Sequence, residues 1–213
     1  MCRILFAKEK NIFNVEKYLS PFSLMCAQSK EYQGHGWGFS YLQNGKWETY
    51  KQITPIWESV FPKNIKTNQI VIHARSAFED KGIKIENNMP FGDENTVYVF
   101  NGELRKTKLN IQGRIGAEKI FNFINRIKKD SYLNAIERGV KIIKKRTEYT
   151  RAMNFIISEK DATYVYSDFN EDEEYFTLMQ LNDNNKQIVC SQILPDFGNN
   201  WNPIPKKEIR IIK

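Results

Sequence analysis

The chain has 213 residues, 41% of them hydrophobic and 27% charged, and its formal net charge is +7. This is the composition of an ordinary globular protein, and the length suits one larger domain, so we expect residues 1–213 to form a single domain. No apolar run is long enough to span a bilayer and the N-terminus lacks a signal-peptide pattern, which excludes a membrane protein and favours a cytoplasmic one.

The basic residues are spread along the chain. The 32 lysines and arginines are mixed with 25 acidic residues, and the one dense cluster, residues 141–146, ends a predicted helix. Basic side chains at a helix C-terminus suit the helix dipole, so we interpret this cluster as a solvated face and expect no nucleic-acid partner. Binding of DNA or RNA through phosphate contacts is a third hypothesis, behind the two given below.

The three cysteines point to a reducing compartment. They cannot all pair with one another, and their spacing fits no zinc motif, so we expect no metal and no cofactor. Cys26 and Cys190 are predicted to be small buried hydrophobic residues.

The first half of the chain predicts strands and short helices. Residues 3–7 are an apolar run typical of a buried strand, and Ser20-Pro21 predicts the start of a helix that ends near Lys30. Asn44-Gly45 is a strong hairpin signal. The strands that flank it, and two further strands, are expected at residues 34–41, 45–50, 69–73 and 96–100.

Two other segments of this half have weaker signals. Thr54-Pro55 predicts the start of a short helix, because Thr is favoured at the N-cap and Pro at the first helical position. Residues 79–94 are polar and predict a long loop, and loops of this length usually have a function.

The second half predicts helices followed by strands. Apolar residues recur at helical spacing in two stretches, Ile120, Phe123, Ile124 and Ile127, and then Leu133, Ile136, Val140 and Ile143. Strands are expected at residues 153–158, 163–167, 175–179, 187–191 and 208–212. Strands at both ends with helices between them predict an α+β fold.

Cys2 is the first candidate for catalysis. Once Met1 is removed, Cys2 becomes the N-terminal residue and carries both a thiol and a free α-amine. An α-amine titrates at about pH 8 and can act as the base for the thiol beside it. The alternative is an inert cysteine next to the initiator methionine.

Two predicted strand ends supply candidate partners for Cys2. Arg75 follows one strand, and its planar guanidinium suits a carboxylate, although a surface salt bridge is the alternative. Asn101-Gly102 ends another strand. The Asn amide and the following backbone N–H can form an oxyanion hole, although a simple turn is the alternative.

Several segments, taken in order, resemble the motifs of one protein family. They are Met1-Cys2-Arg3, Gly36-Trp37-Gly38-Phe39-Ser40-Tyr41, His73-Ala74-Arg75-Ser76-Ala77, residues 87–91, Phe100-Asn101-Gly102-Glu103, and Cys190-Ser191-Gln192-Ile193-Leu194 with Trp201. Together they resemble the class II glutamine amidotransferases, which belong to the N-terminal nucleophile hydrolases. The resemblance covers essentially the whole chain.

This resemblance implies a fold and a reaction. The implied fold is a four-layer αββα sandwich, in which two antiparallel sheets lie face to face with helices outside. Cys2 would attack the side-chain amide of glutamine or of a related γ-glutamyl amide, with its own α-amine as the base. Asn101 and Gly102 would stabilise the oxyanion, and Arg75 and Ser76 would bind the substrate. Neither a metal nor a cofactor is implied.

The sequence departs from the family pattern at the substrate site. Members that bind free glutamine carry an Asp, at the start of the helix after the Asn-Gly turn, that pairs with the substrate ammonium; the matching residue here is Gly116. Glu118 could substitute for it, but it more closely matches the family's own Glu position. Phe78, Met89 and Phe100 replace more polar residues of the motifs, which predicts a more apolar pocket.

Two hypotheses follow for function. The first is an amidohydrolase that acts on glutamine or a γ-glutamyl amide; any ammonia acceptor would lie on a separate synthase subunit, because 213 residues leave no room for a synthase domain. The second is a non-catalytic relative that binds a ligand or a partner protein. The oligomeric state is not predicted.

Overall fold

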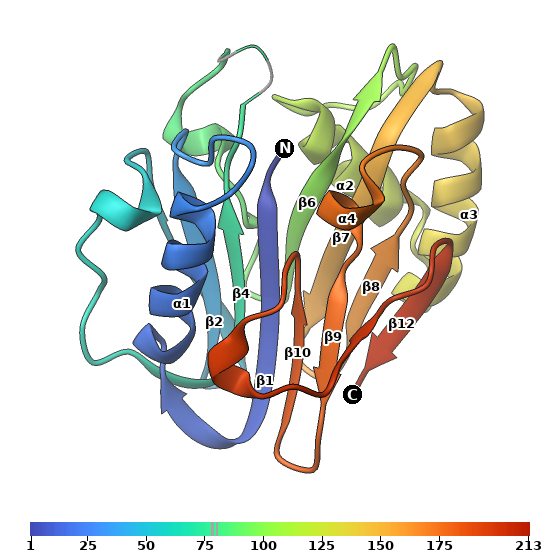
Figure 1. Cartoon of the computed structure of the whole chain (residues 1–213). Helices are drawn as coiled ribbons and strands as arrows, with labels where there is room; N and C mark the ends of the chain where they lie inside the picture. The colour runs from blue at the N-terminus through green and yellow to red at the C-terminus, as the bar shows by residue number, and fades with distance from the viewer. Residues whose placement is uncertain (78, 80) are drawn as a thin grey trace.

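The computed structural model describes residues 1–77, 79 and 81–213 (Figure 1). The strands are β1 (Arg3–Asn14), β2 (Trp37–Gln43), β3 (Lys46–Gln52), β4 (Lys66–Ala74), β5 (Phe91–Gly92), β6 (Thr96–Arg105), β7 (Tyr149–Glu159), β8 (Thr163–Ser167), β9 (Met179–Asn182), β10 (Lys186–Cys190), β11 (Trp201–Pro203) and β12 (Glu208–Ile212). The helices are α1 (Glu16–Ala27), α2 (Gly116–Ile127), α3 (Tyr132–Lys145) and α4 (Glu173–Phe176), with the 3-10 turns η1 (Ile56–Glu58), η3 (Ile85–Asn87) and η4 (Pro195–Phe197).

These strands form two antiparallel sheets that lie face to face in the described part of the chain. The order is β11-β9-β10-β1-β4-β2-β3 in the larger sheet and β12-β8-β7-β6-β5 in the smaller one. Helix α1 covers the outer face of the larger sheet, and α2 and α3 cover the outer face of the smaller one (Figure 1). The predicted four-layer αββα sandwich of α+β class is therefore confirmed.

Strand β1 lies in the middle of the larger sheet and is buried on both faces. Because side chains alternate along a strand, Ile4 and Phe6 pack between the two sheets while Leu5 and Ala7 pack against α1. All of these side chains are fully buried. The apolar run at the N-terminus is thus the central strand of the fold, and it carries Cys2 at its end.

The helices α2 and α3 are amphipathic and confirm the spacing predicted for them. Their apolar faces pack on the smaller sheet, where Ile120, Ile124, Ile136 and Ile143 are at most 3% exposed. Cys26 and Cys190 are also buried, as expected for small hydrophobic residues. Within the described residues, no helix is both long enough and apolar enough to cross a bilayer.

The hairpin prediction is confirmed. Asn44 and Gly45 both have positive φ angles, 52° and 77°, which is the conformation that a two-residue turn between twisted strands requires. The strands predicted at residues 163–167 and 208–212 match β8 and β12. Thr54-Pro55 precedes the 3-10 turn η1, and the segment predicted as one long loop contains η3 and β5.

The predicted start of the first helix is wrong. Helix α1 begins at Glu16, and Pro21 lies inside it. The Glu16 N–H donates to the Asn14 side-chain oxygen over 3.0 Å, which supports the true start. The helix tolerates an internal proline because Leu19 and Phe22 are fully buried against the larger sheet.

The strand predicted at residues 175–179 is also wrong. This segment contains the short helix α4, and β9 begins only at Met179. Asp172 has a φ of 47°, and its carbonyl accepts hydrogen bonds from Tyr175 N and Phe176 N over 2.9 and 3.0 Å. These hydrogen bonds close a helical turn, although aromatic residues such as Tyr175 and Phe176 are typical of strands.

We predict that Ile4→Ala lowers the free energy of unfolding by about 2–5 kcal/mol, because it leaves a cavity between the two sheets. Ile12→Ala is the matched control on the same strand, since Ile12 is 71% exposed, and it should cost less than about 0.5 kcal/mol. Urea unfolding followed by circular dichroism measures both. Equal losses would contradict the central position of β1.

Candidate functional site

Cys2 lies against the segment that follows β4. Strands β1 and β4 are antiparallel with Arg3 opposite Ala74, so the start of β1 meets the end of β4. The Cys2 thiol donates to the Ser76 carbonyl over 3.7 Å, and Cys2 is 8% exposed. Strand pairing therefore brings Cys2, Arg75 and Ser76 together, although 72 residues of sequence lie between Cys2 and Arg75.

The Arg75 side chain is buried, and the hydrogen-bond acceptors around it among the described residues are neutral oxygens. Its guanidinium donates to the carbonyl of Gly82 over 2.9 Å and to the side-chain oxygen of Asn88 over 3.4 Å. Within the described residues, no carboxylate forms an ion pair with it. Burial lowers the pKa of Arg75 from its ordinary value, and a bound anion would compensate the charge.

Asn101 and Gly102 come from the other sheet. They lie in β6, opposite Asn154 and Met153 of β7. Asn101 is fully buried, and neither its amide nitrogen nor its oxygen has a hydrogen-bond partner among the described residues. A Cβ at position 102 would lie 2.2 Å from the Ala152 carbonyl, so only glycine fits there.

A cavity of about 810 Å³ joins these positions. Cys2, Arg75, Ser76 and Gly102 all line it, and Asn101 precedes Gly102 without being part of the lining. The larger apolar side chains of the wall include Met89, Phe100, Leu104, Leu109, Ile115 and Ile120. The prediction of an apolar pocket holds for Met89 and Phe100, whereas Phe78 lies outside the described residues.

Gly116 lies in the wall of the same cavity, and an added Cβ there would meet nothing within 4 Å. Glu118 is not part of the lining. Its carboxylate accepts hydrogen bonds from the Arg114 backbone and guanidinium, and the guanidinium holds the pKa of Glu118 below its ordinary value. Glu118 is therefore engaged with Arg114 and does not substitute for an acidic group at position 116.

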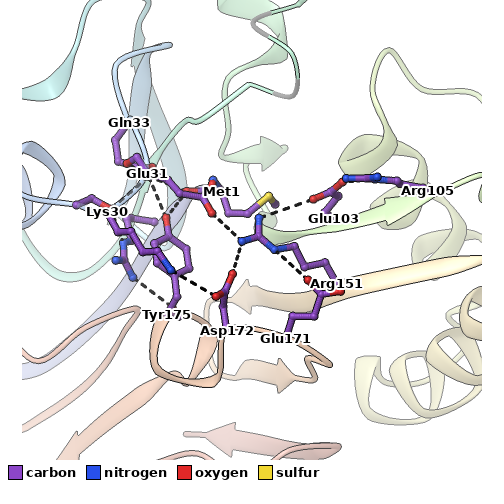
Figure 2. Close-up of polar contacts among 12 residues, drawn as sticks. Met1, Lys30, Glu31, Gln33, Glu103, Arg105, Arg151, Glu171, Asp172 and Tyr175 are labelled. Carbon is purple, nitrogen blue, oxygen red and sulfur yellow. Dashed lines mark hydrogen bonds and ion pairs between the residues drawn. The ribbon is translucent and has the colours of Figure 1, made fainter.

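A polar cluster that the sequence did not predict holds Met1 (Figure 2). The Met1 α-amine forms an ion pair with Glu31, and the Met1 carbonyl accepts hydrogen bonds from the Gln33 amide over 2.6 Å and the Tyr175 hydroxyl over 2.5 Å. Arg151 pairs with Glu31 over 3.0 Å and also with Asp172. The Met1 side chain is only 13% exposed as a result.

A second set of contacts fixes the strand beneath Cys2. The Arg3 guanidinium donates to Ser29 Oγ and the Ser191 carbonyl, each over 3.1 Å, and it stacks on the Tyr175 ring at 3.9 Å. The Ile4 N–H donates to Ser191 Oγ over 2.9 Å. The segment around Ser191 therefore positions the start of β1.

Burial controls the protonation of the site. It raises the pKa of the Cys2 thiol, and the N-terminal amine, the Ser76 backbone and the charge of Arg75 only partly oppose this. The thiol is therefore protonated at neutral pH, so a neighbouring base must remove its proton to form the nucleophilic thiolate. Burial, together with the charges of Arg75 and Lys51, lowers the pKa of His73 to about 3.

We predict that folded protein with Met1 in place resists an added methionine aminopeptidase, because the Met1 amine and carbonyl are both bound. Protein exposed to the enzyme in mild urea should lose Met1, as measured by intact mass. Glu31→Gln combined with Tyr175→Phe removes two of the contacts and should speed the loss in the folded state. Equal rates in all three samples would contradict the described binding of Met1.

We predict a pH dependence of stability that arises from His73. Its folded pKa of about 3 lies below its unfolded value, so between about pH 6.5 and pH 3 the unfolded state alone binds the proton. The free energy of unfolding should therefore fall by about 1.4 kcal/mol for each pH unit as the pH decreases through this window.

The matched variants for this test are His73→Gln, which should lose this part of the slope, and His35→Gln, which should keep it. Urea unfolding at a series of pH values measures the slope. Identical slopes in wild type and His73→Gln would contradict the assignment.

No protein-family model and no curated protein matches the sequence, but several solved structures do. A predicted glutamine amidotransferase from Pseudomonas aeruginosa PA01 is 15% identical with a TM-score of 0.63, and the match covers 99% of this chain and 96% of that one. A glutamine aminotransferase class-II domain protein from Silicibacter pomeroyi is 11% identical with a TM-score of 0.66, and the match covers 99% and 94% of the two chains.

The glutamine phosphoribosylpyrophosphate amidotransferase of B. subtilis, solved with ADP and GMP, is also similar. It is 16% identical with a TM-score of 0.62, and the match covers 89% of this chain and 42% of that one. This chain therefore spans less than half the length of that enzyme. At these identities the likeness shows the fold, and the chain has the sandwich fold of the glutamine amidotransferase structures, as its sequence motifs predicted.

Proposed function

We propose that the protein is an amidohydrolase that cleaves the side-chain amide of glutamine or of a related γ-glutamyl amide through a Cys2 thioester. The observation that carries this proposal is the convergence of Cys2, Arg75, Ser76 and Gly102 on one cavity, from strands of two different sheets. The fold shared with glutamine amidotransferase structures supports it.

The proposed nucleophile is the Cys2 thiolate. Removal of Met1 frees the Cys2 α-amine, which titrates at about pH 8 and can take the thiol proton. This base is required because burial raises the pKa of the thiol. The thiolate attacks the amide carbonyl, the amine returns the proton to the leaving nitrogen, and water then hydrolyses the thioester.

Asn101 and Gly102 are the proposed oxyanion donors. The Asn101 amide is buried without a hydrogen-bond partner among the described residues, which is costly unless a ligand pairs with it. A negatively charged oxygen beside it would supply that partner. In comparable sites, one such donor contributes roughly 3–4 kcal/mol to the stabilisation of the transition state.

Arg75 and Ser76 are the proposed substrate-binding residues. The guanidinium of Arg75 is held in place by backbone and amide oxygens, so its charge can be used to pair with a substrate carboxylate. Ser76 lies beside it in the cavity wall and its carbonyl contacts the Cys2 thiol. Binding the carboxylate at Arg75 would fix the amide relative to Cys2.

Other parts of the proposal concern the whole protein. We propose that residues 1–213 act as one cytoplasmic domain without nucleic-acid partners, and that any ammonia acceptor lies on a separate synthase subunit. Small-molecule amides are the only substrates proposed.

The second candidate is a non-catalytic relative that binds a ligand or a partner protein, and one observation favours it. That observation is the set of contacts to Met1, whose amine and carbonyl are bound by Glu31, Gln33 and Tyr175. As long as Met1 is retained, the Cys2 nitrogen is an amide without basicity. Intact mass of native material separates the two functions. Full retention of Met1 favours the non-catalytic candidate.

We predict that a γ-glutamyl diazo-ketone, or its N-acetyl derivative, labels Cys2 of the processed protein, because both place an electrophilic carbon where the amide would lie. Peptide mapping by mass spectrometry locates the label. Asn101→Ala should lower the rate of ammonia release about 10²–10³-fold, and Cys2→Ala should abolish it. Cys26→Ala is the control and should leave labelling unchanged. Labelling elsewhere with Cys2 unmodified would overturn the proposal.

A further inference from the structure

The cavity beside Cys2 is larger than a free amino acid requires. Its volume of about 810 Å³ lies in the range of pockets that hold drug-sized ligands. A glutamine clamped at Arg75 with its amide at Cys2 would fill only one end of such a space. The remaining volume indicates a substrate that carries a further group in addition to the glutamyl part.

The lining of that remaining volume is apolar. Leu104, Leu109, Ile115 and Ile120 form the wall contributed by the end of β6, the start of α2 and the segment between them. Ile120 is 3% exposed and belongs to the core that packs on the smaller sheet, so this wall is backed by rigid structure. An apolar group on the substrate would be favoured there by about 25 cal/mol for each Å² buried.

The charged residues of the cavity disfavour an ammonium group. Among the described residues, the lining includes six basic side chains and three acidic ones. Each acidic side chain has a basic partner: Glu79 pairs with Lys81, Glu103 with Arg105, and Glu31 with Arg151. Every carboxylate of the lining therefore has a cation, and Glu31, at the Met1 end of the cavity, is the one that also binds an ammonium group, that of Met1.

The start of α2 adds to this bias. Gly116 contributes no side chain, and Lys119, also in the lining, lies one helical turn further on. The first turn of a helix carries partial positive charge. A substrate ammonium near this end of the cavity would face positive charge with no acidic partner, which is unfavourable in a partly closed site.

We propose that the preferred substrate is a γ-glutamyl amide whose α-nitrogen is acylated by an apolar group. The α-carboxylate would pair with Arg75, the uncharged acylated nitrogen would lie near Gly116, and the apolar group would contact the wall around Ile120. This proposal rests on the proposed function and narrows its substrate class. Gly116 is then a specificity-determining position, because it leaves room for the acyl group and supplies no carboxylate.

The test compares ammonia release by processed protein from N-phenylacetyl-L-glutamine and from L-glutamine. Wild type should show a kcat/KM at least about tenfold higher for the acylated substrate. Gly116→Asp places a carboxylate where an added Cβ meets open space, so it should raise kcat/KM for glutamine and lower it for the acylated amide. Gly116→Asn has nearly the same size without the charge, so it should lower activity on the acylated amide without improving that on glutamine.

Each outcome is decisive. A wild-type preference for L-glutamine, with Cys2 labelled by the diazo-ketone, overturns this inference and leaves the proposed function standing. Loss of glutamine activity in Glu31→Gln would then identify Glu31 as the ammonium partner. Failure of both amides together with an unlabelled Cys2 overturns the proposed function as well. Equal behaviour of the Asp and Asn variants overturns the role assigned to charge at position 116.

Discussion

The antiparallel pairing of β1 with β4 is the constraint on which the rest of the structure depends. Arg3 lies opposite Ala74, and this register alone places the residue before β1 beside the residues after β4. A shift of the strand pairing by one residue would turn every β1 side chain to the opposite face of the sheet. Ile4 and Phe6 would then leave the core between the two sheets and face α1. The position of Cys2 therefore follows from core packing of the central strand, and the contacts of Arg3 and Ile4 with the segment around Ser191 hold the start of that strand in place.

Contact between the two sheets completes the site. Strand β6 belongs to the smaller sheet, yet Gly102 lines the same cavity as Cys2, because the sheets pack face to face and the ends of β1, β4 and β6 meet at one edge. The site concentrates groups that are unfavourable to bury, above all the Arg75 guanidinium and the Asn101 amide, which has no hydrogen-bond partner within residues 1–77, 79 and 81–213. Burying such groups costs free energy unless a partner compensates them.

Periodicity and turn chemistry predicted most of the architecture. The hairpin at Asn44-Gly45 and the two amphipathic helices follow from local rules, and so does the buried strand after Cys2. The start of α1 and the helix α4 did not follow, because burial against the sheet outweighed the Pro21 signal and a left-handed Asp172 closed a turn within an aromatic run. The sequence motifs contain the lining residues Cys2, Arg75, Ser76 and Gly102, whereas Asn101, predicted with them, is not part of the lining. The groups that hold Met1 are scattered in sequence and give no local signal, since each meets Met1 only through the tertiary fold.

These groups bear on how reactivity is controlled at Cys2. Burial favours the protonated thiol, and in the described structure the nitrogen of Cys2 is an amide while the terminal amine is bound to Glu31. The amide nitrogen of Cys2 cannot then serve as the base. Removing Met1 converts the Cys2 nitrogen from an amide into an amine with a pKa of about 8. It also removes a side chain that packs against a small buried cluster that includes Phe169 and Tyr175. One residue therefore separates a thiol without an adjacent base from a nucleophile with its base attached.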